Sequence, residues 1–315
     1  MECSSIAVQG GGYNKPRPFC LGGHKEMTNF SVQSELQDEI VEAIRKCINR
    51  NMQQDEIQAL FPNQVLRDDV LELLNRYCTV VYYPLEDENN NGFHITDIPD
   101  KNGKLHTFVF INSAQTLEKQ IFTAAHELGH IWQVDQYVEQ ECDLEVGEAL
   151  RERIINRFAA ELMIPQKVFE ESYRVEYQKV EMPDKKITLG NMLVVIVNLM
   201  NQFLVPEKAI VVRCFELHKI SQQTANLILG EGEVRKDIID KKIGEIIRDN
   251  GYIKFQNPTN KKWIARYADL LDKADRSGKI SKDKIKKIRT MFSINEEDIQ
   301  EKLNDPLNVE GPNAS

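Results

Sequence analysis

The chain has 315 residues, of which 41% are hydrophobic and 28% are charged, and its formal net charge is −9. This length suggests about two domains, and the composition indicates a folded protein with a substantial core. Because binding to a phosphate backbone needs clustered positive charge, a nucleic-acid partner is not expected.

Apolar runs and cysteines limit the class of protein further. The longest apolar run, Met192–Val197, is far shorter than the ~20 residues that a membrane span needs, so no membrane association is predicted. The six cysteines include no Cys-x-x-Cys pair, which indicates neither a disulfide framework nor a zinc ribbon. The predicted location is the reducing cytoplasm.

The N-terminal part of the chain is predicted to hold a tail and two helices. Residues 1–30 are rich in glycine and polar residues, a composition typical of a disordered tail. From Ser34, a suitable N-cap, apolar residues recur at helical spacing as far as Ile48, and Val65–Tyr77 is predicted as a second helix.

Three strands are predicted next. Thr79–Tyr83 is a β-branched and aromatic run, and Phe93–Ile98 and His106–Ile111 flank a turn sequence and form a strand pair. The third strand directly precedes the helix described below. Its edge is therefore predicted to hold an extended peptide beside that helix.

The rest of the chain is predicted to be mainly helical. In Ile121–Gln133 the apolar residues step by four, three and four, which predicts one buried stripe. A helix from about Val146 to Met163 ends before Pro165, which cannot continue it. Further helices are predicted near 190–203 and 206–218, followed by a charged helical region.

The first of these helices carries the pattern H-E-x-x-H at His126, Glu127 and His130. Residues four apart lie on neighbouring turns of one helix face, so both imidazoles can bind one metal ion. Glu127 is rotated off that face, where its carboxylate can take a proton from an attacking water molecule. Histidines that merely form hydrogen bonds are the alternative, but an otherwise apolar stripe flanked by strands favours a zinc site.

A catalytic zinc site needs a third protein ligand, and the following helix offers Glu152. Glu152 heads a stripe that is otherwise largely apolar, where a carboxylate is costly unless it is paired or bound to metal. Asn156, one turn later, is placed to accept the distal N–H of a ligating imidazole. Two alternatives remain: Glu148 is the ligand, or Glu152 forms an ion pair with a neighbouring arginine.

Two segments together resemble the ImmA/IrrE metallopeptidases. They are FTAAHELGHIW at 122–132 and ERIINRFAAELMIP at 152–165, and the second is similar to the family signature E-x-x-A-N-x-F-A-A-x-L-L-M-P. The resemblance extends from about 65 to 218 and implies that Glu152 is the third zinc ligand. Ile155 and Met163–Ile164 depart from the signature in packing rather than in chemistry.

The predicted fold class is α+β: a zincin-like small sheet packed on the metal-binding helices, followed by a mainly helical C-terminal region. The predicted divisions are a metallopeptidase domain at 31–165, a helical segment at 166–230 and a helical extension at 231–315. The resemblance implies a cytoplasmic zinc endopeptidase that cleaves a helix-turn-helix transcriptional repressor.

Two other classes of function stay open from the residues alone. In a non-proteolytic regulatory or toxin–antitoxin module, zinc would be structural and held by a closed set of four ligands. In a DNA-binding regulator, residues 190–218 would form a helix-turn-helix, although the second helix offers few basic residues, namely Lys208, Arg213, His218 and Lys219. The sequence leaves the oligomeric state open.

Overall fold

The structure is a computed structural model. It describes residues 36–54, 65–87, 89–99, 102–180, 187–230, 236–252, 255, 257–264, 267–278 and 280–291. The predicted tail at 1–30 lies outside the described residues.

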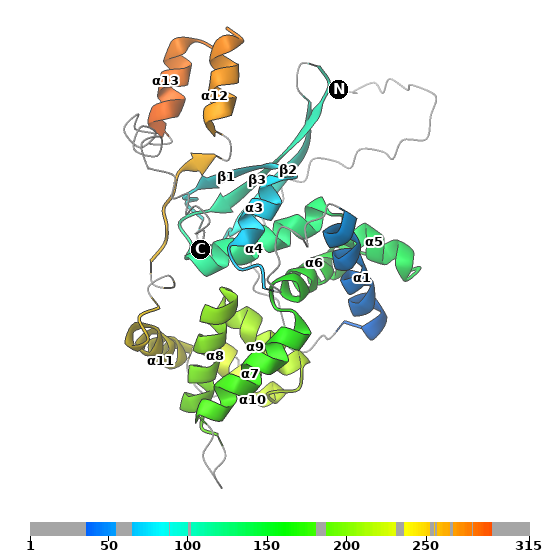
Figure 1. The fold of residues 1–315 in the computed structure, drawn as a ribbon, viewed down its shortest axis with the longest axis vertical. Coiled ribbons are helices and arrows are strands. Elements are labelled where there is room, and N and C mark those ends of the chain that lie inside the picture. The colour runs from blue at the N-terminus through cyan, green and yellow to red at the C-terminus, as the bar shows by residue number, and fades with distance from the viewer. Residues whose placement is uncertain are drawn as a thin grey trace, which may run out of the picture.

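A small mixed sheet lies beside the N-terminal helices (Figure 1). Its strands are β1 (Thr79–Tyr83), β2 (Gly92–Pro99), β3 (Leu105–Asn112) and β4 (Trp263–Ile264). The strand order is β2-β3-β1-β4, with β3 parallel to β1 and antiparallel to β2. The three predicted strands are confirmed, whereas β4, which pairs antiparallel with β1, was not predicted.

The prediction that the third strand forms an edge is wrong. β3 lies between β1 and β2 and forms ladders with both of them. Its backbone groups are therefore engaged on both sides and cannot bind a substrate strand. The outer strands of the described sheet are β2 and β4.

Helices make up most of the described chain and fall into groups that follow the sequence (Figure 1). The first group comprises α1 (Asp38–Gln54), α3 (Asp69–Asn75), α4 (Leu117–Ile131), α5 (Val134–Glu141) and α6 (Glu148–Met163). The next group comprises α7 (Gln166–Val180), α8 (Leu189–Phe203), α9 (Glu207–Glu216), α10 (Gln222–Leu229) and α11 (Lys236–Asp249). The last two are α12 (Tyr267–Arg276) and α13 (Lys282–Met291).

Helix α4 connects the sheet to α6. It contacts β2, β3 and α6, and its predicted apolar stripe is buried, with Ile121, Ala125 and Leu128 fully inaccessible to solvent. Gly129 is required for the close approach of α6, because a Cβ atom there would lie 2.8 Å from Phe158 Cδ1. Any larger residue would push the two helices apart.

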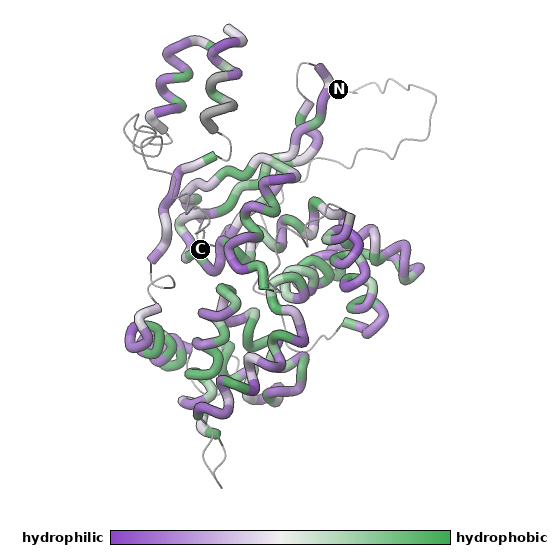
Figure 2. Tube along the Cα trace, in the orientation of Figure 1, coloured by the Kyte–Doolittle hydropathy of each residue, from purple (hydrophilic) through white to green (hydrophobic). Residues whose placement is uncertain are grey.

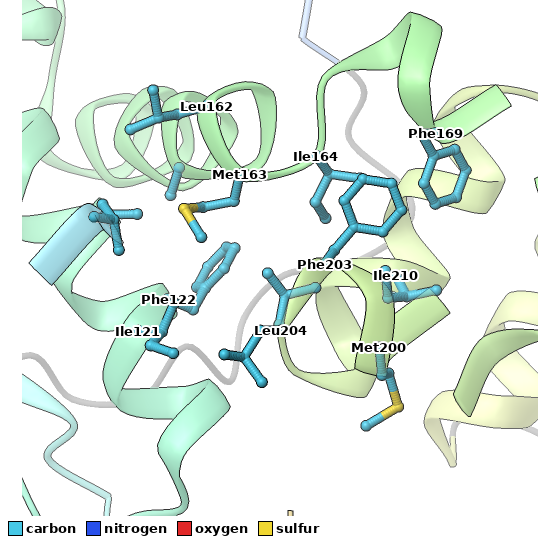
Figure 3. Packing of buried hydrophobic residues seen from close by; sticks show 14 of the residues in the cluster. Ile121, Phe122, Leu162, Met163, Ile164, Phe169, Met200, Phe203, Leu204 and Ile210 are labelled. Atoms are coloured by element: carbon cyan, nitrogen blue, oxygen red, sulfur yellow. The ribbon is translucent and has the colours of Figure 1, made fainter. Parts of the chain in front are cut away.

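The hydrophobic core continues from α4 and α6 into the second group of helices. Phe122 lies near Met163 and Leu204, and Ile164 lies near Phe203 (Figure 3). In Figure 2 the hydrophobic colour follows the middle of the sheet and α8. This arrangement confirms the predicted α+β fold: a small mixed sheet packed on helices and followed by a mainly helical region.

Helix α8 holds the longest apolar run of the sequence, and α9 follows it after a short break. No single helix among the described residues is long and apolar enough to cross a membrane. Taken together, α8 and α9 reach that length and composition, but they are bent by 109° at the break between them.

A buried ion cluster joins α1, α6 and α9. It consists of Arg45, Arg157, Glu161, Arg213 and Glu216, and the Glu161 carboxylate accepts hydrogen bonds from all three arginines. The side chain of Arg213 is fully buried. It is therefore committed to this cluster, and α9 does not present it to DNA.

Candidate metal centre

His126 and His130 lie on neighbouring turns of α4, and their imidazole rings converge. The two Nε2 atoms are 3.2 Å apart. Both side chains are about nine-tenths buried, with 10% of each exposed. The helical spacing of four residues thus brings two nitrogen ligands to one point, as H-E-x-x-H predicts.

Glu152 reaches the same point from α6. Its carboxylate oxygens lie 3.5 Å from His126 Nε2 and 3.7 Å from His130 Nε2. One ligand atom from each of the three residues can be chosen so that all lie within 4.8 Å of one another. Among the described residues, this trio is the group of histidine, cysteine and carboxylate side chains that is arranged to hold a metal ion.

The alternatives for the third ligand find less support in the structure. Glu148 is 77% exposed at its side chain and forms an ion pair with Arg151. Arg151 also pairs with Asp135, and Arg157 belongs to the buried ion cluster. The geometry therefore brings Glu152, and not Glu148, to the two histidines.

Asn156 fixes the orientation of one imidazole. Its Oδ1 lies 3.0 Å from His126 Nδ1, which is the contact predicted from the spacing along α6. Because this amide oxygen can only accept, Nδ1 of His126 carries the proton and the lone pair on Nε2 faces His130 and Glu152. This is the tautomer that a metal ligand needs.

Glu127 is buried beside the same site and contacts a residue that the sequence analysis missed. Its side chain is 1% exposed, and Oε2 lies 2.7 Å from Nδ1 of His94 on β2. The ring of His94 also lies beside that of His130, with 4.9 Å between the ring centroids. A strand of the sheet thus contributes a side chain to the site.

The surroundings of Glu127 shift the pKa values of its neighbours. Burial lowers the pKa of His94, but the hydrogen bond to Glu127 and the negative charges of Glu127 and Glu152 outweigh burial and raise it above its ordinary value. Burial, followed by the charge of Glu127, raises the pKa of the Cys78 thiol to about 12. Cys78 is not among the side chains that converge with His126 and His130.

The donor set fits a zinc ion. Two histidine nitrogens and one carboxylate are the ligands of many catalytic zinc sites, which keep a further position open. Two nitrogens that bind zinc at 2.0–2.1 Å in a tetrahedral arrangement lie about 3.3 Å apart, close to the separation of the two Nε2 atoms here. The burial of the two histidine side chains and the fixed tautomer of His126 add to this fit.

Comparison with known protein families indicates what kind of domain carries this site. Residues 76–215 match the model of the IrrE N-terminal-like domain, Peptidase_M78. The chain carries a Peptidase_M78 domain. This family supports a metallopeptidase function, and the matched region spans the strands β1 to β3 and the helices α4 to α8. A comparison with curated proteins gave no match.

The assignment of Glu152 as the third ligand in the Peptidase_M78 domain can be tested by substitution. Glu152→Ala is expected to weaken zinc affinity by more than about 100-fold, because losing a partner outside the metal's own ligands already costs 10–100-fold. Glu148→Ala is the matched control on the same helix and should retain wild-type metal content. Elemental analysis after dialysis against graded chelator measures both. Loss of metal only in the Glu148 variant would show that Glu148, one turn earlier, is the third ligand.

Proposed function

We propose that this chain is a zinc-dependent endopeptidase whose substrate is a helix-turn-helix transcriptional repressor. The observation that carries the zinc assignment is the convergence of His126, His130 and Glu152, whose ligand atoms lie within 4.8 Å of one another. The repressor rests on the resemblance to the ImmA/IrrE metallopeptidases. The cytoplasm remains the proposed location, in keeping with the free thiols among the described cysteines.

The proposed chemistry divides between the metal and Glu127. A zinc ion held by the trio would polarise the scissile carbonyl and lower the pKa of water. Glu127 takes a proton from the attacking water as the new C–O bond forms, and it returns that proton to the amine nitrogen as the C–N bond breaks.

The corrected sheet order changes where the substrate is proposed to bind. β2 is an outer strand of the described sheet, and its residue His94 contacts Glu127. An extended peptide that pairs with β2 would gain main-chain hydrogen bonds beside the metal trio. The cut is therefore expected in a segment of the repressor that is exposed or locally unfolded.

A structural zinc site is the competing proposal, and it finds less support. A closed site uses four protein ligands, whereas the group found among the described residues supplies three. A DNA-binding role for residues 190–218 also loses support, because Arg213 is buried in the ion cluster.

Co-expression with the product of the neighbouring gene, compared with co-expression of the Glu127→Gln variant, tests the proposed function. Mass spectrometry should find fragments of the partner only with the wild-type chain. In parallel, the purified zinc-loaded protein is incubated with a library of unstructured peptides. Cleavage of peptides but not of the partner would support the endopeptidase activity and exclude this partner as the substrate. Cleavage of neither would contradict the proposed activity.

A further inference from the structure

We propose that His94 is a positioning residue for the hydrolysis, which donates a hydrogen bond from Nδ1 to Glu127 and thereby holds the carboxylate in its working orientation. The inference rests on the proposed function of Glu127 as the base. It adds an element of the fold, strand β2, to a site otherwise built from α4 and α6.

The contact itself is short and shielded. His94 Nδ1 and Glu127 Oε2 are 2.7 Å apart, with the Glu127 side chain 1% exposed and that of His94 26% exposed. Because a carboxylate only accepts, the proton of this hydrogen bond lies on Nδ1 of the imidazole. A charge-assisted hydrogen bond of this length is among the stronger ones in proteins. It restrains one oxygen of Glu127 and leaves the other for the reacting water.

Strand β2 turns His94 toward α4 by means of a β-bulge. Near the hairpin turn, Ile98 pairs with His106, and continuing that register would place Ile95 opposite the buried Val109. The register instead shifts between Ile95 and Ile98, so that His94 is opposite Val109. A shift of one residue exchanges the two faces of a strand, and bulges beside active sites often redirect a side chain in this way.

Asp97 and Gly92 hold this segment in place. Asp97, inside the bulge, has φ 60°, a left-handed conformation that is uncommon for residues other than glycine. A Cβ atom on Gly92 would lie 2.7 Å from Thr123 Cγ2 on α4 and 2.6 Å from the Phe110 carbonyl oxygen. Only glycine therefore allows β2 to lie so close to α4 at a point two residues before His94.

The aromatic neighbours of His94 restrict its ring. The ring lies 4.9 Å from that of His130, and the preceding Phe93 stacks on Phe110 with 4.7 Å between centroids. The strand is thus anchored on both sides of the sheet. A side chain on this strand is a rigid support for Glu127, as positioning within an active site requires.

Three replacements of His94 test the proposal, because they differ in where the donor lies. Asparagine places an N–H donor near the position of Nδ1, glutamine places it near Nε2, and phenylalanine keeps the ring but has no donor. Each variant is loaded with zinc and assayed on the peptide library. His94→Phe and His94→Gln should lower kcat by roughly 10–100-fold with KM changed by less than about twofold, whereas His94→Asn should stay within about threefold of wild type.

Several results would overturn the proposal. The first two are a wild-type kcat in His94→Phe and equal activity of the asparagine and glutamine variants. A rise in KM alone would show that His94 contacts the substrate instead. Loss of zinc from His94→Phe would show that His94 supports metal binding instead. His106→Asn on β3 is the matched control and should leave kcat unchanged.

A second readout does not depend on activity. In the metal-free protein, imidazole nitrogen NMR should show the Nδ1-protonated form of His94, and Glu127→Ala should change that signal. If the wild type cleaves no peptide, the proposed function fails while this experiment still decides the contact. An unchanged spectrum in Glu127→Ala would show that the two side chains do not interact in solution.

Discussion

Glu127→Gln is expected to abolish peptide hydrolysis while leaving the metal bound. The substitution removes the group that accepts a proton from water but leaves all three proposed ligands, His126, His130 and Glu152, in place. General acid–base catalysis contributes typically 10²–10⁴-fold, so kcat should fall by about that factor. Activity on the peptide library and metal content by elemental analysis measure the two effects separately.

The environment of Glu127 allows this substitution to remove the charge with little change in packing or hydrogen bonding. Glutamine has nearly the same size as the buried carboxylate, and its Oε1 can still accept from His94 Nδ1. Glu148→Gln, at an exposed position of α6, is the matched control and should hydrolyse at the wild-type rate. Full activity of Glu127→Gln would exclude Glu127 as the base, and loss of metal from it would assign Glu127 a part in metal binding.

The metal trio could be predicted because each step depends on local helical geometry. The spacing of His126 and His130 fixes their relative position within one helix, and the contact of Asn156 with His126 follows from the spacing along the next one. Glu152 needed the additional assumption that α6 packs against α4. A largely apolar stripe interrupted by one carboxylate was sufficient to suggest it.

His94 could not be predicted because its direction depends on the register of a strand pair. The sequence places the strands and the turn between them correctly, and an unbroken register would put Ile95 on the inner face instead. The bulge near Asp97 reverses this, and no glycine marks it. A histidine inside the second predicted strand was the available signal, but it does not show which face the side chain occupies.

The fourth strand was missed for a related reason. Two residues of the C-terminal region, Trp263 and Ile264, pair with β1 and cover its edge. A segment of two residues gives no periodicity, and its partner is about 180 residues earlier in the chain. The aromatic ring of Trp263 packs on Tyr82, and Lys261 lies over both rings, contacts that only tertiary structure reveals.

Glu161→Gln is expected to destabilise the protein by about 3–5 kcal/mol, the typical cost of removing one partner from a buried ion pair. Glu161 accepts two hydrogen bonds from the fully buried Arg213, at 2.8 and 2.9 Å. Without the carboxylate charge, the positive charge of the buried Arg213 is no longer balanced by Glu161. For a chain of this size the melting temperature should fall by on the order of 10 °C.

Differential scanning fluorimetry of the metal-free protein measures this effect without a contribution from zinc. Glu141→Gln is the matched control, because it breaks the exposed pair between Glu141 and Lys46 and should leave the melting temperature nearly unchanged. A small shift in Glu161→Gln, similar to that of the control, would mean that the cluster contributes little net stability.

The same pair of proteins gives a pH dependence whose sign follows from the pKa of Glu161. Burial alone would raise that pKa, but Arg213, Arg157 and Arg45 outweigh burial and lower it to about 2. A carboxyl group whose pKa is lower in the folded than in the unfolded state stabilises the fold at pH values above its unfolded pKa, about 4.5. This contribution disappears as the pH falls from about 4.5 toward 2.

The difference in melting temperature between wild type and Glu161→Gln should therefore be largest near neutral pH and shrink as the pH falls below about 4.5. Protonated Glu161 is then neutral, like glutamine, so the two proteins converge. Glu216 faces the same arginines, and its pKa is raised by burial and also by the charge of Glu161. A difference that stays constant down to pH 3 would show that the carboxylate charge does not stabilise the junction of α1, α6 and α9.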